Sequence, residues 1–342
     1  MNSLRTSMLA VLLALLVPPI LISSAAMAAE PAAETADVPV DPAIREFAAQ
    51  LASEDGLNEA DVLAVLSGAE KRQSILDAMA RPAEGKAWKD YRPIFLTDKR
   101  VDDGIAFVNA NRELLDKVSA EYGVPVGIIA AIIGVETSYG KNIGSYRVID
   151  ALSTLAFYYP PRSKFFRSEL RELFLLNGKH LAYPLDELKG SYAGAMGLGQ
   201  FMPSSIANYA VSYDGDDRID LWNSMPDITA SVASYFAGHG WEKDQPVAVR
   251  AIASENAADY KPENLEASST VQQLEAWGYS PLEHADADRP ATLLTLEGEY
   301  GPERWITFKN FYVISRYNRS ALYSMAVFQL AGEITAGVAA AK

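Results

Sequence analysis

Apolar positions in the N-terminal part of the chain recur at the spacing of amphipathic helices. This pattern predicts helices at residues 41–56, 58–70 and 72–80. Residues 91–97, with the sequence YRPIFLT, are predicted to form an extended connector, because a residue that precedes proline avoids helical backbone. A further amphipathic helix is predicted over residues 102–122. Apart from this connector, residues 41–110 are therefore expected to be helical.

The pattern changes in the second half of the chain. Residues 141–245 keep helical spacing between loops at 158–163, 177–200 and 212–226. Beyond them the segments PVAVRAI, ATLLTLEG and RWITF alternate or are β-branched, which predicts short strands, with a helix in SSTVQQLEAWG between them. A closing helix is predicted in SALYSMAVFQLAGEI. We therefore predict a mainly α fold of the α+β class, with the strands in a small subdomain at 246–309.

The most apolar predicted helix, PVGIIAAIIGVETSYG at residues 125–140, ends with its only carboxylate, Glu136. At helical spacing Glu136 shares a face with Ile129, Ile132 and Ile133, which should be buried. Burial would raise the pKa of this carboxyl and suit it to general acid catalysis. Taken alone, however, the segment favours an ordinary glutamate that turns to water at a helix end, because perturbed carboxyls are the minority outcome.

The sequence lacks the motifs that several other common kinds of active site require. The histidines, His180, His239 and His284, stand far apart and no HExxH motif occurs, which argues against a histidine-based zinc site. No GxSxG elbow, GxGxxG fingerprint or complete phosphate loop is present. With no cysteine and no Ser/His pair, carboxylate chemistry remains.

A glycine-rich stretch, GSYAGAMGLGQFMPSS at residues 190–205, is a second candidate element. Its small residues would let the backbone approach a ligand closely and would present Ser191, Tyr192, Gln200 and Met202 around it. Hydroxyl, amide and aromatic groups are what sugars and acetamido groups require. A tight packing loop between helices explains the composition equally well, so the stretch alone leaves both interpretations open.

An acidic stretch, SYDGDDRIDLWNSMPD at residues 212–227, has oxygen side chains at positions 1, 3, 5 and 9 of an EF-hand-like loop, namely Ser212, Asp214, Asp216 and Asp220. The glycine usual in such a loop is missing, so an acidic turn between helices is the alternative. If the loop holds a metal, we expect weak structural calcium bound through Asp214, Asp216 and Asp227. No cofactor is expected to be required.

The N-terminus has the features of an export signal. Arg5 supplies positive charge, residues 8–22 are apolar, and AMA at 26–28 fits a small-x-small cleavage site. A permanent membrane anchor is the alternative, but the apolar run is short and contains two prolines. We expect cleavage after Ala28 and a soluble mature protein in a bacterial periplasm. Residues 29–40, rich in alanine, proline and acids, should form a disordered spacer.

The overall composition is that of a globular protein, with 342 residues of which 49% are hydrophobic and 22% charged. The net charge of −14 argues against a nucleic-acid partner, which would favour a basic face. The absence of cysteine excludes disulfides and the acylated cysteine of a bacterial lipoprotein, so no lipid anchor is expected.

Five stretches in order resemble the membrane-bound lytic murein transglycosylase B family, which includes the soluble lytic transglycosylase B group: GVETSYG, GSYAGAMGLGQFMPSS, DGDDRIDLWNS, YFAGHGW and FYVISRYNRSALYSMAV. The resemblance covers residues 44–330. It implies a lysozyme-like catalytic core with a helical and a small β-containing subdomain. The expected boundaries are a signal peptide at 1–28, a spacer at 29–40, a helical subdomain at 41–110, the core at 111–245, an α+β subdomain at 246–309 and a C-terminal helix at 310–335 that returns to the core.

The resemblance also implies an activity. Family members cleave the β-1,4 bond between N-acetylmuramic acid and N-acetylglucosamine in peptidoglycan without water and leave a 1,6-anhydromuramoyl end. Glu136 matches the family's single catalytic acid/base. Residues that match positions contacting sugar or lining the groove are Ser191, Gln200, Tyr91, Arg162, Tyr235, Tyr317, Asn318 and Tyr323. Core packing is the alternative role for the tyrosines, above all for Tyr235 in mid-helix.

Some positions depart from the family pattern. Pro161 stands where some members have a second arginine and Phe165 where some have tyrosine, which puts peptide-stem or distal sugar contacts in doubt. Ser212 replaces the first acidic ligand of the metal loop, so calcium affinity should be reduced. The expected partner is the glycan strand of peptidoglycan, with cell-wall synthesis or hydrolase complexes as a further class, and the protein is expected to be a monomer.

Two alternative functions remain at this point. A lysozyme-type hydrolase could use the same fold, and only its products would separate it from a transglycosylase. A non-catalytic wall-binding protein belongs to a different class, but such a protein has no use for a buried acid at Glu136.

Overall fold

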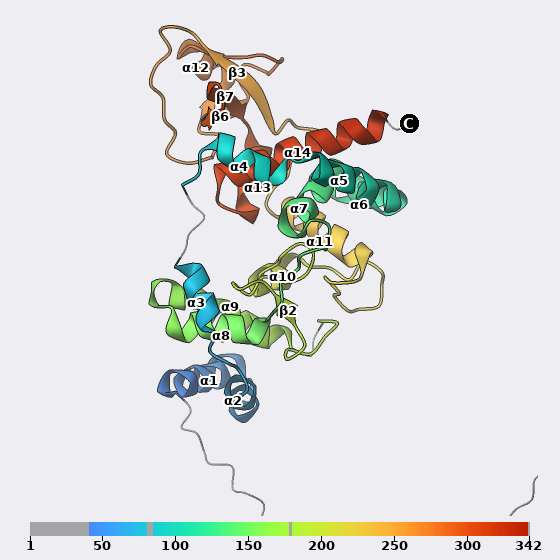
Figure 1. The fold of residues 1–342 in the computed structure, drawn as a ribbon, viewed down its shortest axis with the longest axis vertical. Helices are drawn as coiled ribbons and strands as arrows, with labels where there is room; N and C mark the ends of the chain where they lie inside the picture. Colours follow the sequence, from blue (N-terminus) through green and yellow to red (C-terminus); the bar gives the residue numbers. More distant parts are fainter. Residues whose placement is uncertain (1–40, 81–84, 178–179, 341–342) are drawn as a thin grey trace, which may run out of the picture. The chain divides into compact units, whose positions relative to one another are not determined.

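The computed structural model describes residues 41–80, 85–177 and 180–340. The chain divides into a unit of residues 1–39 and a unit of residues 40–342, and the second unit is described below. The predicted signal peptide and spacer lie outside the described residues. The fold is mainly helical with a small sheet, as predicted (Figure 1).

The first helices are α1 (Pro42–Asp55), α2 (Glu59–Ser67) and α3 (Gln73–Met79), and they confirm the predicted ones. Capping side chains start two of them, since the carboxylate before α1 and the amide before α2 each accept a backbone N–H. Asp150, buried on a later helix, accepts two bonds from the guanidinium of Arg72 at 3.1 and 2.9 Å and so anchors the chain just before α3.

The segment predicted as an extended connector is helical instead, because α4 runs from Trp88 to Phe95. Pro93 lies inside it, yet proline in a helix of two turns removes only one backbone bond. The buried side chain of Trp88 packs against the sheet and compensates for that loss. The prediction from the proline was therefore wrong, and tertiary packing decided this helix.

The single helix predicted over residues 102–122 is in fact two helices, α5 (Asp98–Ala110) and α6 (Arg112–Tyr122). The break lies at Asn111, whose φ of −120° is not helical. Its side-chain amide donates to the Phe107 carbonyl at 2.9 Å, and this local bond replaces the continuation of the helix.

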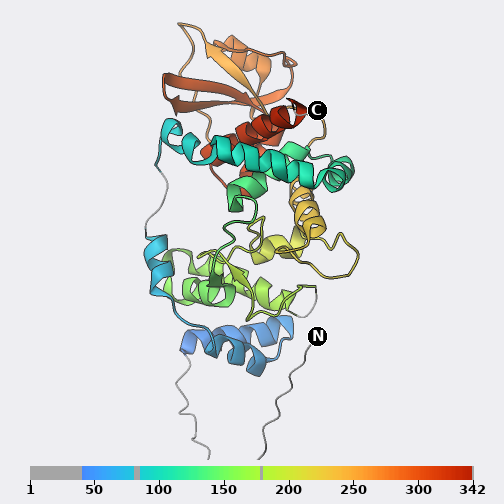
Figure 2. The same cartoon turned by 45° about the vertical axis from the view of Figure 1, so that its right-hand side comes forward.

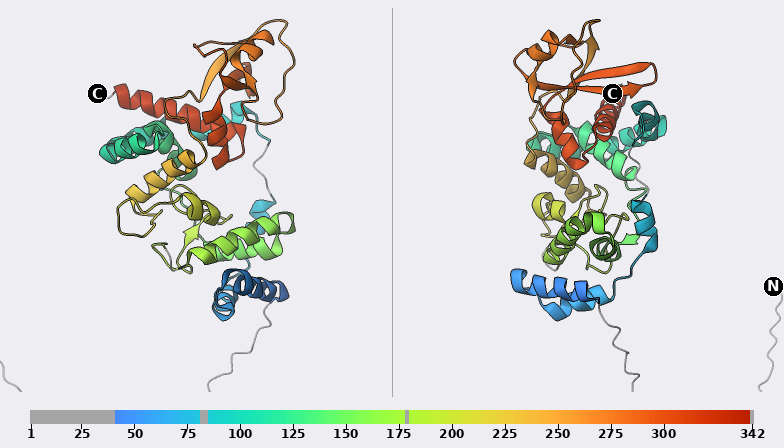
Figure 3. Two further views of the ribbon diagram at one scale, coloured as in Figure 1. Left: turned by 180° about the vertical axis from the view of Figure 1, so that it is seen from behind. Right: turned by 90° about the vertical axis from the view of Figure 1, so that its left-hand side faces the viewer.

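The helices that surround the candidate site follow in the chain. They are α7 (Val126–Thr137), α8 (Val148–Tyr158), α9 (Ser163–Leu176), α10 (Pro203–Tyr209) and α11 (Met225–Gly238), with a 3₁₀ turn at Pro160–Arg162 and a two-stranded ribbon of β1 (Tyr146–Arg147) and β2 (Lys189–Gly190). Helices α8 and α9 lie side by side, with α3 against α8 (Figure 3). One large apolar core joins these helices.

The predicted strands are present in an antiparallel sheet with the order β4-β6-β7-β3-β5. Its elements are β3 (Ala248–Ala253), β4 (Ser269–Thr270), α12 (Val271–Ala276), β5 (Tyr279–Pro281), β6 (Pro290–Gly298) and β7 (Gly301–Thr307). The hairpin of β6 and β7 closes with the two residues Glu299 and Tyr300, between paired Gly298 and Gly301. All these strands fall within residues 246–309; the subdomain boundaries themselves stay predictions.

The chain closes with two helices, α13 (Lys309–Tyr317) and α14 (Ala321–Ala340), where one was expected. Helix α14 contacts α7, α5 and α4, and Figure 2 shows it beside α5 with the sheet beyond it. Gly127 permits this close packing, because a Cβ there would stand 2.8 Å from the Ala331 carbonyl oxygen. By its length and composition, α14 could span a membrane, and so could α6 and α7 if this bent pair is counted as one span. Half of the apolar stretch of α14 is buried in this fold, as is usual for a core helix of a soluble protein.

Candidate active site

Helix α7 carries Glu136 to the end of a fully buried segment. Ile129, Ile132 and Ile133, on the same face, have no exposed surface. The helix stops directly after the glutamate, because Ser138 and Tyr139 take left-handed backbone with φ of 51° and 60°. Such backbone is costly for residues other than glycine and occurs where surrounding structure enforces it, often at functional sites.

Thr137 joins this helix end to the glycine-rich loop. Its hydroxyl lies 3.1 Å from the Ile133 carbonyl oxygen and 3.0 Å from the Leu198 carbonyl oxygen, and it accepts the Gly140 N–H at 3.1 Å. The side chain is almost fully buried. The residue next to the candidate acid therefore fixes the position of the loop that faces it.

The carboxyl of Glu136 is largely enclosed but keeps a partly exposed surface toward a pocket. Burial raises its pKa from 4.5 to about 7, and a hydrogen bond from the Tyr323 hydroxyl to Oε1, at 2.6 Å, works in the opposite direction. Protonated and ionised forms are therefore both populated near neutral pH. The raised pKa predicted from the isoleucine stripe is confirmed, and the solvated helix-end interpretation is wrong.

Tyr323 remains a hydrogen-bond donor in this arrangement. Burial and the nearby charge of Glu136 raise the pKa of its hydroxyl well above the ordinary value. The same two causes raise the pKa of Tyr317. Both phenols thus keep their protons over the range in which the carboxyl titrates.

The glycine-rich loop forms the opposite wall of the pocket. Ser191 Oγ accepts the backbone N–H groups of Ala193 and Ala195 at 3.3 and 3.1 Å, which leaves its own O–H to donate to a ligand. Gln200 has a φ of 52°, and its amide nitrogen donates to the Ile143 and Gly197 carbonyls at 3.2 and 2.9 Å. Gln200 thus holds the loop in shape, while its carbonyl oxygen accepts nothing from the described residues.

Aromatic rings close the far side. The Tyr317 hydroxyl donates to the Gly199 carbonyl at 2.6 Å. A Cβ on Gly199 would stand 2.8 Å from the Phe201 ring and 3.0 Å from that hydroxyl, so glycine suits this close approach. The Tyr235 ring lies 4.7 Å from the Tyr317 ring, and its hydroxyl donates to the Arg316 carbonyl at 2.6 Å. Both hydroxyls are bound to backbone, so these tyrosines offer the pocket chiefly their rings.

The resulting pocket has a volume of about 350 Å³. It brings together Glu136 and most of the residues predicted from the sequence, namely Ser191, Gln200, Tyr235, Tyr317 and Asn318. Sequence reasoning missed Phe201 and Ser205, which also line it. Both lie at the end of the glycine-rich stretch, Phe201 just before α10 and Ser205 in its first turn.

Three predicted residues lie outside this lining, namely Tyr323, which contacts Glu136 directly, Tyr91 and Arg162. Tyr91 on α4 packs against Trp88 and Phe95. Burial first, and then the charge of Glu136, raise the pKa of its hydroxyl, so Tyr91 lies within electrostatic reach of the acid. Arg162 is exposed and stacks over Phe165 at 4.5 Å, with no part in the pocket wall. The structure therefore joins Tyr91 to the surroundings of the acid but leaves Arg162 apart from them.

The acidic loop does not assemble the predicted metal ligands. Asp227 is fully buried, and its oxygens accept the backbone N–H groups of Tyr213 at 2.7 Å and Asp220 at 2.9 Å. Asp227 therefore holds the loop together through backbone contacts, and its prediction as a metal ligand was wrong. Asp214 accepts from the Ser224 hydroxyl at 2.8 Å and Asp216 is exposed. Across the described ranges no group of three or more acidic, histidine or cysteine side chains is placed to hold a metal ion.

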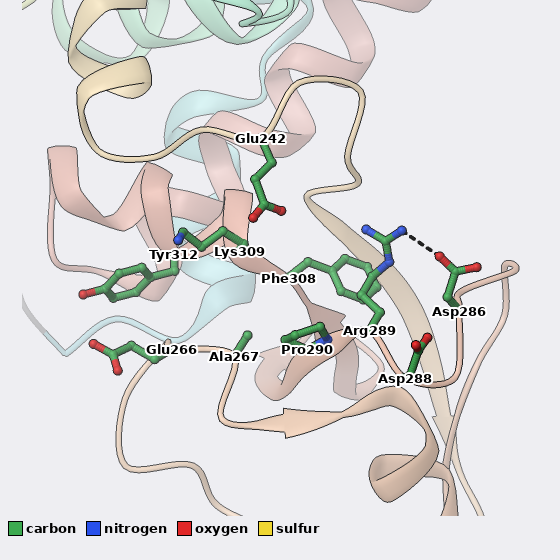
Figure 4. A pocket seen from close by; sticks show the side chains of 10 residues that line it. All are labelled: Glu242, Glu266, Ala267, Asp286, Asp288, Arg289, Pro290, Phe308, Lys309 and Tyr312. Atoms are coloured by element: carbon green, nitrogen blue, oxygen red, sulfur yellow. Dashed lines mark hydrogen bonds and ion pairs between the residues drawn. The ribbon is translucent and has the colours of Figure 1, made fainter.

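A second pocket, of about 560 Å³, lies between α13 and loops of the sheet (Figure 4). Charged side chains surround its Phe308 ring, and Arg289 pairs there with Asp286 at 2.8 Å. None of the residues predicted from the sequence lines it. The candidate active site is therefore the pocket at Glu136.

Comparison with known proteins gives consistent matches over nearly the whole described chain. A family model described as the transglycosylase SLT domain matches residues 39–332. Membrane-bound lytic murein transglycosylase B of Escherichia coli K12 is 39% identical over 300 residues, which cover 85% of this chain and 82% of that protein.

Solved structures agree with this match. Soluble lytic transglycosylase SltB1 from Pseudomonas aeruginosa superposes with a TM-score of 0.81 at 47% identity, covering 86% of this chain and 99% of that one. Escherichia coli lytic transglycosylase Slt35, solved in complex with calcium, gives 0.81 at 38% identity over 89% and 96% of the two chains. SltB3 from Pseudomonas aeruginosa, in complex with NAG-NAM-pentapeptide, gives 0.74 at 29% identity over 85% and 78%.

Proposed function

This chain belongs to the transglycosylase SLT domain family and is a lytic transglycosylase that acts on peptidoglycan, and within that class we propose that Glu136 alone performs both proton transfers. Its protonated carboxyl donates to the glycosidic oxygen as the bond from muramoyl C1 to that oxygen breaks. The ionised carboxylate then accepts the proton of the C6 hydroxyl as the C6 oxygen bonds to C1. No water is consumed, and the product ends in a 1,6-anhydro ring.

The observation that carries this proposal is the state of the Glu136 carboxyl. A pKa of about 7 lets one group act as acid and then as base at neutral pH. Among the described residues that line its pocket, Glu136 is the only carboxylate. A glycoside hydrolase typically uses a pair of carboxylates flanking the bond. The missing partner favours a transglycosylase over a muramidase, with the substrate's acetamido group stabilising the cationic centre.

The surrounding groups support roles in binding the sugar. Ser191 has an O–H to donate, Gln200 offers its carbonyl oxygen, and Asn318 lines the same pocket. Tyr235 and Tyr317 present rings against which the apolar face of a pyranose can pack. We assign Tyr323 to positioning and charge stabilisation of the carboxylate, since its hydroxyl contacts Glu136 directly.

The test of the mechanism is Glu136→Gln. Glutamine keeps the shape of the side chain but can neither donate nor accept the proton, so lysis of purified sacculi should fall by about 10²- to 10⁴-fold or more. Binding of N-acetylglucosamine oligomers should persist. Mass spectrometry should find wild-type muropeptides lighter by one water than those of a muramidase. Reducing muramic ends, or a fully lytic variant, would overturn the proposal.

We also propose that the protein works in the periplasm after removal of residues 1–28. The apolar start of the chain and its lack of cysteine support this, although the Escherichia coli relative is described as membrane-bound. Cell fractionation followed by N-terminal sequencing should find a soluble protein that begins at Ala29. An intact chain in the membrane fraction would contradict this.

A further inference from the structure

A third pocket, of about 400 Å³, shares no residue with the pocket at Glu136. It lies where α4 meets the sheet, and its wall is formed by α4, β3, the β6–β7 hairpin and α14. We call it the α4–sheet pocket. None of the motifs noted in the sequence accounts for it.

Three aromatic side chains line the α4–sheet pocket. Trp88 on α4 and Trp305 on β7 are buried, with 1% and 8% of their surface exposed. Tyr300 is 96% exposed at the tip of the two-residue hairpin turn, where the following Gly301 has a φ of 118°. An aromatic ring held out into water gains nothing for the fold, whereas it offers a stacking surface beside the pocket.

The two tryptophans have an unmet hydrogen-bonding need. The indole N–H of Trp88 and that of Trp305 are both buried without a partner among the described residues. Buried polar groups are nearly always paired, so an unpaired donor calls for an explanation such as a bound ligand or water. Two such donors in the wall of one pocket are matched by a ligand rich in oxygen acceptors.

Two charged side chains at the mouth of the pocket are held by exposed polar contacts. Lys89 and Arg92 are exposed at the mouth of the pocket, where Lys89 pairs with Glu297 at 2.8 Å and Arg92 donates to Gln329 at 2.9 Å. Exposed contacts of this sort contribute little to stability. They can therefore rearrange around a ligand at small cost.

The polar fringe has the chemistry of a saccharide site. Guanidinium, amide and carboxylate groups stand around the rings at Arg92, Gln329 and Glu299, and Glu299 has no partner in the described structure. Sugar hydroxyls and acetamido groups need both donors and acceptors, while the C–H face of the ring needs an aromatic surface. The exposed ring of Tyr300 offers such a surface, while the buried Trp88 and Trp305 contribute their indole N–H groups.

The α4–sheet pocket is also connected to the candidate active site. Trp88 stacks on Tyr91, one turn along α4, with ring centroids 6.4 Å apart and an interplanar angle of 29°. Tyr91 in turn lies within electrostatic reach of Glu136. A single short helix thus supports one wall of this pocket and one flank of the surroundings of the acid.

We propose that the α4–sheet pocket is a second saccharide-binding site, which holds a sugar unit of the glycan strand away from the bond that is cleaved. The proposal rests on the proposed function, because that function supplies the strand. Binding there would strengthen the attachment of long strands and leave the chemistry at Glu136 unchanged.

The direct test observes the indole N–H groups. Nuclear magnetic resonance of the ¹⁵N-labelled protein should show the indole signals of Trp88 and Trp305 shifting on titration with an N-acetylglucosamine tetramer. Trp305→Phe assigns one of them. Tyr300→Ala should raise the dissociation constant obtained from these shifts by about two- to tenfold, the size expected for one lost aromatic contact. Leu282→Ala, at another exposed apolar position of the sheet subdomain, is the matched control and should leave them unchanged.

Activity gives an independent readout. Tyr300→Ala should lower kcat/KM on intact sacculi by a similar factor and leave the turnover of short soluble fragments at the wild-type value. Indole signals that stay fixed at saturating tetramer, or a Tyr300→Ala variant equal to wild type on sacculi, would overturn the second site. Failure of the mechanism would appear separately, as lysis by Glu136→Gln while these indole shifts persist.

Discussion

Replacing Glu136 by glutamine should stabilise the fold at alkaline pH and change it much less at acid pH. Burial raises the pKa of this carboxyl from 4.5 to about 7, a difference of 7 − 4.5, or about 2.5 units. At about 1.4 kcal/mol per unit, ionising the carboxyl in the folded protein costs about 3 kcal/mol relative to the unfolded chain.

The sign follows from which state holds the proton. Below pH 4.5 the carboxyl is protonated in the folded and the unfolded protein, so the cost is absent. Between pH 4.5 and about 7 the unfolded chain ionises first, so the stability of the wild type falls as pH rises. Above that range the loss is complete, and glutamine avoids it while it keeps an acceptor for the Tyr323 hydroxyl.

Urea denaturation at about pH 4 and about pH 8 measures the effect. The gain in free energy of unfolding from Glu136→Gln should be about 3 kcal/mol larger at the higher pH, and taking the difference cancels any constant packing change. Glu283→Gln, which removes an exposed carboxylate, is the control and should show a much smaller difference. An equal gain at both pH values would refute the buried, proton-holding Glu136 on which the mechanism rests.

Three further predictions follow from the contacts of the site. Tyr323→Phe removes the donor that favours the ionised carboxyl, so the pKa of Glu136 rises further and the alkaline limb of the pH–rate profile moves to higher pH; an unmoved limb would contradict this. Gln200→Ala and Tyr317→Phe each loosen the glycine-rich loop at a cost of about 1 kcal/mol, so turnover on sacculi should fall while circular dichroism stays native. Calcium should bind the 212–227 loop weakly, since Asp227 is bound to backbone, and submicromolar affinity in titration calorimetry would show otherwise.

The sequence by itself determined the features that depend on neighbouring residues. Helical periodicity located α1, α2 and α3, and alternation located β3, β6 and β7 but not the short strands β4 and β5. The end of an apolar helix placed Glu136 beside isoleucines that should be buried, and the small residues after Gly190 indicated either a loop close to a ligand or a tight packing loop. These features were predictable because the burial of a helix face and the backbone freedom of glycine depend on residues only a few positions apart in the sequence.

Only the tertiary structure decided what distant segments do to one another. The Tyr323 hydroxyl meets Glu136 across 187 residues of sequence, and no local pattern carries that contact. Packing made α4 helical around Pro93, turned Arg162 away from the pocket and bound Asp227 to the backbone. The pKa of an acid depends on how completely the whole fold excludes water from it. The raised pKa of Glu136 therefore depends on the packing of α7 against α14 and the glycine-rich loop, which distant parts of the sequence supply.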